Sequence, residues 1–497
     1  MGEGQELEGI SRHGRERPDA PALILGEEVR SFGALDDRTN RLAHVLRDRG
    51  AEPGTTVAAV LPNGFEFFET GLATSRLSAG FLPVNWHLKT DELSWILGDS
   101  GAAVAVTDAA HADLVRTAAG DRTSVLVAGD EYESLLDART GAATLPSAAS
   151  WAPVFYTSGT TGRPKGVIQG SFTPDQRRAG QEGQRLLWSW GPDDVYIVSG
   201  PAYHAGPGGW AMTALYVGAT TVILPAWDAR EWLRTVERRR VTRSFMVPAH
   251  FIRILEVPEV ERRARDLSSL RLIVHGAAPC PVDVKRRIIE LFGSAEVWEL
   301  YGMSEGGATR ISPDEWLRKP GSVGTPWPGV QVRVLDENGD ERKPGEDGLI
   351  YVLPPGGGRF RYHGDPAKTA AAWREEGFTV GDVGHLDEDG YLFVTDRAAD
   401  MVIRGGVNIY PREVEDALHR HPAVVDCAVF GVPDPRHGEH LVAVVETRQP
   451  IDAEALKAHC RSLLADFKCP EQVDVVDTLP RDPAGKVLKR RLREQYA

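Results

Sequence analysis

The sequence predicts an α/β protein with a large N-terminal α/β domain built on parallel sheets and a smaller C-terminal α+β domain. Its 497 residues exceed what one hydrophobic core usually supports, so we expect at least two domains. From residue 22 onward, short apolar runs such as Val57–Leu61 and Phe81–Val84 alternate with helical patterns such as Phe65–Leu77. Strands separated by helices indicate parallel βαβ units with helices on both faces of a sheet.

The turn Asp396–Asp400 is the expected domain boundary, which gives domains of residues 1–396 and 397–497. Beyond this turn, runs of helix and strand length indicate a small α+β unit. They are Pro411–His419, Val424–Phe430, Leu441–Glu446 and Ala453–Ala465. Pro411 suits the first turn of its helix, where a backbone N–H has no helical partner.

Composition and charge narrow the class of protein. The chain has 42% hydrophobic and 26% charged residues, as soluble globular proteins do, and its net charge of −14 argues against nucleic acid as the main partner. No apolar run has the length of a transmembrane helix, and the acidic stretch Met1–Leu7 is unlike a signal peptide. The four cysteines lack the spacing of a zinc site or a disulfide framework. We therefore expect a cytoplasmic enzyme.

The most informative stretch is Tyr156–Val167, which follows the apolar run Trp151–Tyr156 and is rich in glycine and hydroxyl residues. Glycine lets backbone N–H groups approach an anion, hydroxyls add donors, and Lys165 adds a charge suited to phosphate. Ligands bind beyond the carboxyl ends of strands in open parallel sheets, which is where this loop is expected. A flexible surface turn is the structural alternative. The expected anion-binding residues are Thr157, Ser158, Gly159, Thr160, Thr161 and Gly162.

This stretch is not the P-loop of common NTPases, because Pro164 and Lys165 stand where that pattern needs Gly and Lys. It resembles the phosphate-binding signature of the AMP-forming adenylating enzymes, which include acyl-CoA synthetases, peptide-synthetase adenylation domains and luciferases. Four further motifs occur in the family's order, and the resemblance covers nearly the whole chain. Ala277–Cys280 and Gly405–Pro411 look most like bacterial fatty-acyl-CoA synthetases. The resemblance implies that the C-terminal domain is mobile.

Three of these motifs are expected to bind the nucleotide. Small residues after the apolar strand Leu270–Val274 would let adenine lie against the backbone, although an ordinary strand-to-helix turn is the alternative. These residues are Gly276, Ala277, Ala278 and Pro279. The next motif, Tyr301–Gly307, resembles the family's Tyr-Gly-x-Thr-Glu, with Ser304 in place of Thr. Tyr301 can stack on adenine, beside Gly302, and the resemblance assigns Asp382 and Arg397 to the ribose.

The resemblance also assigns the metal and the catalytic groups. Glu305 supplies the hard oxygen that Mg²⁺ prefers, and Thr161 is the second expected metal ligand. Lys486 ends the tail Pro480–Lys486 and matches the lysine that reaches the reacting carboxylate and the α-phosphate; a solvated surface charge is the alternative. Lys165, Glu305 and His204 complete the expected catalytic set.

The acyl group and the thiol are assigned to two glycine-containing segments. Pro201–Trp210 reads as a Gly/Pro-rich loop after the strand Asp193–Ser199, and His204 matches an aromatic residue that gates the family's thiol channel. The expected acyl-pocket residues are His204, Gly208, Gly209 and Trp210; Trp210 can equally pack in the core. Gly405 and Gly406 are assigned to the CoA pantetheine channel, and Ala399 to the hinge.

The implied enzyme is an acyl-CoA synthetase whose partners are a fatty or aryl carboxylic acid, ATP with Mg²⁺, and CoA. The acid attacks the α-phosphorus of ATP to give an acyl-adenylate and pyrophosphate, and the CoA thiol then expels AMP. One alternative keeps adenylation but uses another acceptor or acid: a carrier protein, an amine, or nitrite for diazotisation. A second is a non-catalytic nucleotide-binding homologue. The sequence leaves the acid unidentified and a homodimer open.

Overall fold

The computed structural model describes residues 7–145, 153–157, 164–169, 173–355, 359–398, 400–404, 407–434, 438–483 and 485–496. The chain divides into two compact units, each formed from segments distant in sequence. The first unit contains Met1–Met246, Ala264–Ile273 and Gly358–Thr369, and the second contains Val247–Arg263, Val274–Gly357 and Ala370–Ala497. The domain boundary expected at residues 396 and 397 stays a prediction.

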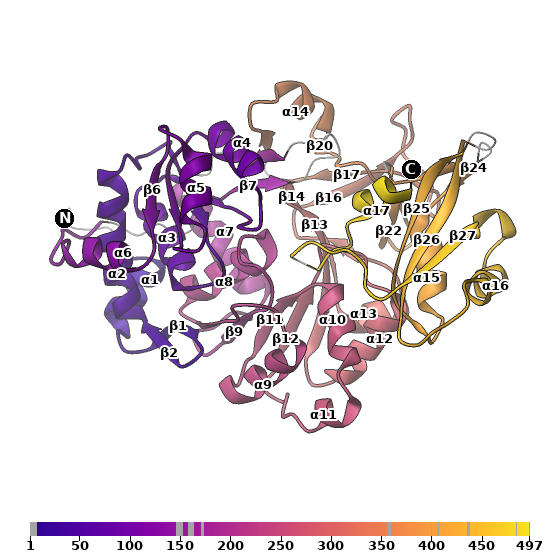
Figure 1. The fold of residues 1–497 in the computed structure, drawn as a ribbon, viewed down its shortest axis with the longest axis horizontal. Helices are drawn as coiled ribbons and strands as arrows, with labels where there is room; N and C mark the ends of the chain where they lie inside the picture. Colours follow the sequence, from indigo (N-terminus) through magenta and orange to yellow (C-terminus); the bar gives the residue numbers. More distant parts are fainter. Residues whose placement is uncertain are drawn as a thin grey trace. The chain divides into compact units, whose positions relative to one another are not determined.

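A four-stranded parallel sheet in the first unit confirms the predicted βαβ units (Figure 1). Its order is β4 (Gly80–Pro83), β3 (Thr56–Val60), β5 (Ala102–Thr107) and β6 (Ser124–Val127). The helices α3 (Phe65–Arg76), α4 (Thr90–Ser100) and α5 (Ala112–Ala119) connect these strands. The sheet packs through buried aliphatic side chains such as Val60, Leu82 and Ile96, which are each at most 3% exposed.

The first unit also contains five strands in the order β11 (Arg243–Met246), β9 (Val195–Val198), β10 (Thr220–Ile223), β1 (Pro21–Leu25) and β2 (Glu28–Ser31). All neighbours in this row are parallel except β1 and β2. A separate antiparallel sheet has the order β18 (Arg361–Tyr362), β8 (Lys165–Ile168) and β7 (Val154–Thr157). The remaining helices are α1 (Gly9–Glu16), α2 (Phe32–Asp48), α6 (Asp130–Asp137), α7 (Pro174–Leu187), α8 (Ala205–Val217) and α9 (Ala229–Arg239).

Local sequence explains where several of these helices begin. The Ser31 hydroxyl accepts a hydrogen bond from the Ala34 N–H at 3.2 Å, which caps the helix α2. The Asp228 carboxylate caps α9 by accepting from the Glu231 N–H at 2.7 Å.

Among the described residues, no helix is long and apolar enough to span a membrane.

Before the C-terminal sheet, the described residues of the second unit form two antiparallel groups of strands. One is β15 (Thr325–Pro326), β14 (Gly306–Ile311) and β13 (Glu296–Met303). Another is β19 (Trp373–Arg374), β20 (Gly377–Phe378), β17 (Gly348–Leu353), β21 (Asp382–Leu386) and β22 (Leu392–Arg397), with β16 (Gln331–Leu335) paired to β17. The strand β12 (Leu272–His275) contributes residues to both units.

The C-terminal part contains the predicted α+β unit. Its sheet has the order β24 (Val407–Ile409), β23 (Val402–Arg404), β26 (Gly438–Thr447) and β25 (Val424–Asp434), and β27 (Gln472–Val476) pairs in parallel with β26. The helices of the second unit are α10 (Pro248–Glu256), α11 (Glu259–Arg263), α12 (Val282–Leu291), α13 (Pro313–Arg318), α15 (Pro411–His419), α16 (Ala453–Leu463), η2 (Asp466–Lys468) and α17 (Lys489–Tyr496); α14 (Pro366–Ala372) contributes to both units.

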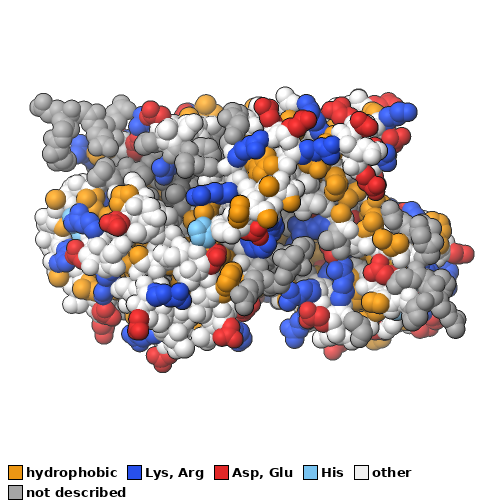
Figure 2. All heavy atoms as spheres, turned by 90° about the horizontal axis from the view of Figure 1, so that it is seen from above, with side chains coloured by type: hydrophobic (Ala, Val, Ile, Leu, Met, Phe, Trp, Pro, Cys, Tyr) orange, Lys and Arg blue, Asp and Glu red, His pale blue; other side chains and the backbone are white. Residues whose placement is uncertain are grey.

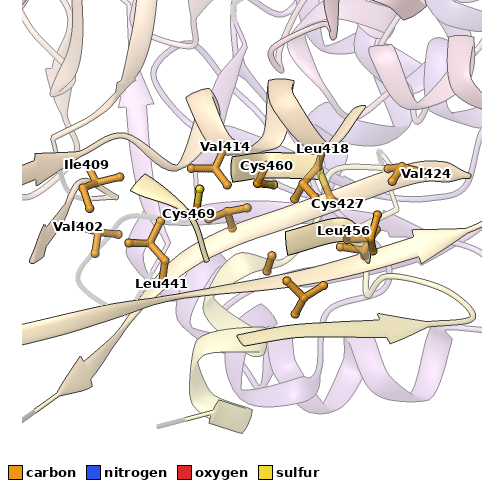
Figure 3. Packing of buried hydrophobic residues seen from close by; sticks show 14 residues of the cluster. Val402, Ile409, Val414, Leu418, Val424, Cys427, Leu441, Leu456, Cys460 and Cys469 are labelled. Carbon is orange, nitrogen blue, oxygen red and sulfur yellow. The ribbon is translucent and has the colours of Figure 1, made fainter. Parts of the chain in front are cut away.

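The core of this C-terminal part lies between its sheet and the helices α15 and α16 (Figure 3). Buried aliphatic side chains such as Val414, Leu441 and Leu456 meet there, and burying each large one stabilises the fold by about 1.5–3 kcal/mol. Cys427, Cys460 and Cys469 belong to the same cluster. Together with the buried Cys280 they are free thiols, so the expectation of no disulfide framework matches all four cysteines.

The structure corrects the prediction of a loop over Pro201–Trp210. Residues from Ala205 onward begin the helix α8, which accommodates Pro207 because a first-turn N–H has no partner inside the helix. A Cβ on Gly206 would lie 2.3 Å from Cε1 of Phe245, so this glycine admits the aromatic ring. The motif that begins at Tyr301 also starts on a strand, because β13 runs on through Tyr301 to Met303.

Candidate active site

Three of the residues expected to bind the nucleotide meet at the strands β13, β21 and β22 of the second unit. The Tyr301 hydroxyl donates to Oδ2 of Asp382 at 2.7 Å, and Nε of Arg397 donates to Oδ1 at 3.2 Å. Asp382 and Arg397 are direct cross-strand partners, and Asp382 is only 7% exposed. Desolvation raises the pKa of Tyr301, and the neighbouring Asp382 charge raises it further, so the phenol stays protonated.

The hairpin that follows Tyr301 holds the expected metal ligand. Ser304 and Glu305 form the two-residue turn between β13 and β14, and both are partly buried. Gly302 pairs with Gly307, and a Cβ on Gly302 would lie 3.2 Å from the Cα of Gly307. The two glycines thus let the strands approach closely where the turn begins.

The small residues after β12 form a tight strand-to-helix connection. A Cβ on Gly276 would lie 2.7 Å from the carbonyl oxygen of Leu300, so glycine is required by the neighbouring backbone. Ala277 has a φ of +67°, in the left-handed region that L-residues rarely adopt. This connection continues through Ala278 and Pro279 into α12. Packing thus explains Gly276, while the strained Ala277 backbone is of the kind that clusters at ligand sites.

Lys486 follows a tight turn closed by Asp482. The Asp482 carboxylate accepts from the Lys486 N–H at 2.9 Å, and the Asp482 N–H donates to the Lys486 carbonyl at 2.8 Å. Desolvation lowers the pKa of Lys486, and Arg397 lowers it further, while Asp482, Asp400 and Asp382 act in the opposite direction. The residue as a whole is exposed, so solvent moderates these effects. The structure therefore brings Lys486 within electrostatic range of Asp382 and Arg397.

Lys165 lies in the first unit and is paired with a residue that the sequence did not single out. Its Nζ donates to Oδ2 of Asp365 at 2.7 Å, and this hydrogen bond and charge lower the pKa of Asp365. Lys165 begins β8, directly opposite Thr157 at the end of β7. Thr157 and Lys165, two described residues of the expected phosphate-binding stretch, thus pair in an antiparallel sheet, which corrects the expected parallel one. Ser158, Gly159, Thr160, Thr161 and Gly162 lie outside the described residues.

The expected acyl-pocket residues lie at the start of α8, also in the first unit. His204 is the residue before the helix, and its ring is tilted against that of Tyr203 with the ring centroids 4.6 Å apart. A Cβ on Gly209 would meet no atom within 4 Å, whereas Gly208 is buried. Trp210 is partly buried against Trp188, Trp190 and Phe245, with ring centroids 5.3–5.9 Å away. An aromatic cluster therefore surrounds Trp210, the residue after Gly209 on α8.

Three assignments concern residues that the structure does not describe. Gly405 and Gly406, expected in the pantetheine channel, and Ala399, the expected hinge, lie outside the described residues. Their neighbours are described: Arg397 ends β22 and Arg404 ends β23.

The carboxylate of Glu305 fits a cation that is bound only partly by protein groups. No group of three or more His, Cys, Asp or Glu side chains is arranged to hold a metal within the described parts of the chain. Mg²⁺ usually keeps several waters and is bound through one or two carboxylates plus substrate phosphates. A single carboxylate at Glu305 suits that mode of binding.

Sequence reasoning missed two charged residues that the fold places beside predicted ones. Asp365 lies 200 residues from its partner Lys165. Arg481 lies four residues before Gly485 and donates to its carbonyl at 3.0 Å. The close spacing of Arg481 and Lys486 within one turn can be read from the sequence. The pairing of Asp365 with Lys165 cannot.

Known proteins of one family match this chain over nearly its whole length. The profile of the AMP-binding enzyme family matches residues 10–359, and that of the AMP-binding enzyme C-terminal domain matches residues 413–486. A feruloyl-CoA synthase from Amycolatopsis is 37% identical over 494 residues, covering 98% of each chain. The fatty acid–[acyl-carrier-protein] ligase ScoC from Streptomyces coeruleorubidus is 31% identical, covering 98% of this chain and 95% of its own.

Solved structures share the same fold over the full length. The o-succinylbenzoate-CoA synthetase from Bacillus subtilis, solved in complex with its acyl-adenylate intermediate, superimposes with a TM-score of 0.84 at 27% identity. The match covers 98% of each chain. The predicted α/β class, with a large N-terminal and a small C-terminal domain, is thereby confirmed.

Proposed function

Because the chain belongs to the AMP-binding enzyme family, we propose that it is an ATP-dependent acid–CoA ligase that works through an acyl-adenylate. The observation that carries this proposal is that Tyr301 and Arg397 both contact Asp382, with Lys486 within electrostatic range in the same unit. A non-catalytic homologue would have no use for a partly desolvated lysine beside these groups, and perturbed groups of this kind cluster at functional sites.

Asp382 and Arg397 are the proposed ribose site. A carboxylate has about four lone-pair positions, so Asp382 can accept from both ribose hydroxyls while it keeps Tyr301 and Arg397. Its burial and its two partners hold it in one orientation before the nucleotide arrives. Tyr301 then offers the face of its ring to adenine, because its hydroxyl is already engaged.

Lys486 and Lys165 are the proposed cations of the adenylation step. An oxygen of the substrate carboxylate attacks the α-phosphorus, and the bond from that phosphorus to the pyrophosphate oxygen breaks. Negative charge shifts onto the leaving pyrophosphate, and fixed cations stabilise such a transition state. Lys486 is the proposed contact to the carboxylate and α-phosphate, and Lys165 is proposed to exchange its ion pair with Asp365 for a phosphate contact.

Glu305 is the proposed protein ligand of Mg²⁺, with Thr161 as the second expected ligand. The cation would neutralise phosphate charge when bound with ATP. In the second step the thiol sulfur of CoA attacks the acyl carbonyl, the thiol proton is lost, and the bond to AMP breaks. Gly405 and Gly406 are proposed to line the path of that thiol, and His204 to border the acyl group.

We propose an aryl acid as the substrate class. The closely related feruloyl-CoA synthase supports this choice by its name. The aromatic cluster of Trp188, Trp190, Trp210 and Phe245 also supports it, because aromatic rings pack well against a flat substrate.

A carrier protein is the second candidate acceptor, because ScoC is 31% identical over nearly the same length. Location in the cytoplasm is also proposed. All four cysteines are free and buried, which suits a reducing compartment.

Pyrophosphate release tests the function directly. Ferulic, indoleacetic and decanoic acids are supplied with ATP and Mg²⁺, with and without CoA, and thioester is measured by mass spectrometry. We expect ferulic or indoleacetic acid to give the highest rate, and thioester to form only with CoA. Adenylate that accumulates with CoA present, but is consumed on adding a carrier protein, would favour the second candidate. No pyrophosphate release with any acid would refute adenylation.

A further inference from the structure

Arg481 joins the turn that carries Lys486 to the sheet of the C-terminal part. Its Nη1 donates to the carbonyl oxygen of Gly485 at 3.0 Å. Its Nη2 donates to Oδ2 of Asp426 on β25 at 2.6 Å and lies 3.4 Å from Oε2 of Glu446 on β26. Arg481 therefore uses one nitrogen for the turn and the other for the sheet.

The two carboxylates that hold Arg481 are themselves fixed. Asp426 is 8% exposed and Glu446 is 4% exposed. Oδ1 of Asp426 accepts from the Cys427 N–H at 2.8 Å, and Oε1 of Glu446 lies 3.0 Å from Nη1 of Arg253 on α10. A buried carboxylate without a cation is costly, so these contacts hold the guanidinium in one place.

The residue before Lys486 has little freedom of its own. Gly485 has a φ of +85°, and a Cβ added to it would lie 3.0 Å from the Cβ of Ala249 on α10. Its carbonyl is the group that Arg481 holds. The direction in which the chain enters Lys486 is therefore set by the backbone of Gly485 and by the hydrogen bond from Arg481.

We propose that Arg481 is a positioning residue for adenylation, which fixes the Gly485 carbonyl and thereby aims Lys486 at the reacting phosphate. The proposal rests on the proposed function, which gives Lys486 its role in that half-reaction. Arginine suits this task because two separate nitrogens of one planar group reach two targets. Lysine donates from a single nitrogen, so it lacks the two separate donor positions by which the guanidinium reaches the carbonyl and the carboxylates.

This difference separates positioning from simple stabilisation of the fold. Arg481→Lys keeps a cation beside Asp426 and Glu446 and should unfold near the wild-type temperature, yet it releases the turn. Arg481→Ala removes both contacts and serves as the second variant. Arg490→Ala is the matched control, because Arg490 is an exposed arginine of the same tail whose recorded ion pair is with Glu494.

The kinetic test compares the two half-reactions, using the acid of the panel above that releases most pyrophosphate. Arg481→Lys should lower kcat for pyrophosphate release by about 100-fold, as a misplacement of about 1 Å does, with a smaller change in the KM for ATP. Thioester formation from the supplied acyl-adenylate and CoA should stay close to wild type. Equal losses in both half-reactions, or full adenylation activity in both Arg481 variants, would overturn the proposal.

A second readout does not depend on the substrate. Acetic anhydride labels lysines in their neutral form, and peptide mass spectrometry gives the pH dependence of labelling at Lys486. Release of the turn should move this dependence to higher pH in Arg481→Lys and leave it unchanged in Arg490→Ala. An unchanged dependence in Arg481→Lys would overturn the proposal.

The two readouts distinguish failure of the inference from failure of the proposed function. If Lys486→Ala abolishes adenylation while both Arg481 variants remain fully active, the proposed function stands and the positioning role falls. If wild-type protein releases no pyrophosphate with any acid, the proposed function falls and takes the adenylation role with it. A labelling shift in that case still assigns Arg481 to the Lys486 turn.

Discussion

The phenolic oxygen of Tyr301 lies 2.7 Å from Oδ2 of Asp382, so the residue proposed for adenine and the residue proposed for ribose are joined directly. The hydrogen bond links β13 to β21 across 81 positions of sequence. A hydrogen bond to a charged group contributes about 1.5–3 kcal/mol, and this one is shielded by the burial of Asp382. Two parts of the proposed nucleotide site are therefore held in register before any ligand binds.

Removal of Asp382 should weaken ATP binding. Asp382→Ala is expected to cost about 1.5–3 kcal/mol for each charged hydrogen bond lost to the ribose. Calorimetric titration with ATP measures the loss, and Asp389→Ala, an exposed carboxylate that pairs with Lys319, is the control. Unchanged affinity in the Asp382 variant would remove this residue from the ribose site.

Lys486 should serve the adenylation half only. Lys486→Ala is expected to raise the barrier to adenylation by about 3 kcal/mol or more, because a fixed positive charge at the transition state is lost. Thioester formation from a supplied acyl-adenylate should continue. Lys457→Ala, a lysine of α16 paired with Glu454, should change neither rate. Equal loss of both half-reactions would show that Lys486 is not specific to the first.

Glu305 should determine how much Mg²⁺ the enzyme needs. Glu305→Gln replaces a carboxylate by a neutral amide, which is a weaker ligand for a hard cation. The Mg²⁺ concentration at half-maximal pyrophosphate release should rise, while activity at saturating Mg²⁺ is partly restored. Glu341→Gln, on a surface hairpin, provides the control. An identical Mg²⁺ dependence in both variants would argue for a site made by the phosphates without Glu305.

The hinge assignment predicts that the two half-reactions separate on substitution of Ala399. Ala399→Pro fixes φ near −65°, and a C-terminal domain that must rotate between two orientations should then be held in one. One half-reaction should persist and the other should be lost, as measured by pyrophosphate release and by thioester formation from supplied adenylate. An unchanged rate of complete CoA ligation would mean that rotation about Ala399 is not required.

Gly406 gives an independent check on the same rotation. Gly406→Leu should block the proposed thiol path, so that thioester formation falls while pyrophosphate release stays nearly intact. A matched change at Gly390, a glycine with positive φ in the surface turn after β21, controls for general loss of stability.

Stability at low pH should depend on Asp426. Burial raises its pKa, but His419 and Arg481 outweigh this and lower it to about 2. A carboxylate with a lowered folded-state pKa stabilises the fold above its unfolded pKa of about 3.9, and this contribution is lost as the pH falls towards 2. Asp426→Asn should cost about 2 kcal/mol at pH 6 and progressively less below pH 4. Urea unfolding at several pH values measures this, and a difference independent of pH would contradict it.

The regular elements could be predicted because local patterns determine them. The helices at Phe65 and Pro411 begin where the sequence places them, and the strands β3 and β25 differ from prediction by a few residues at their ends. The start of α8 was missed because Gly206, Pro207, Gly208 and Gly209 read as a loop. Contact with Phe245, 39 positions away, requires glycine at Gly206 and is not visible in a local pattern.

In the candidate site, too, single residues could be predicted from local motifs, but contacts between distant residues could not. Motifs marked Tyr301, Asp382 and Lys486 individually, but the hydrogen bond between Tyr301 and Asp382 depends on how two sheets pack. The pairing of Lys165 with Asp365 likewise needs the antiparallel contact of β8 with β18. On the face drawn in Figure 2, basic side chains are interspersed with acidic ones.

The reactivity of the three thiols in the C-terminal core reports local unfolding of that core. Burial raises the pKa of Cys427, Cys460 and Cys469, so the reactive thiolate is scarce while the core is closed. Alkylation at neutral pH therefore requires transient opening, and its rate follows the free energy of that local event. Since all three lie in one packed cluster, they should exchange as one cooperative group. Native-state thiol exchange can thus follow the C-terminal core without an introduced label.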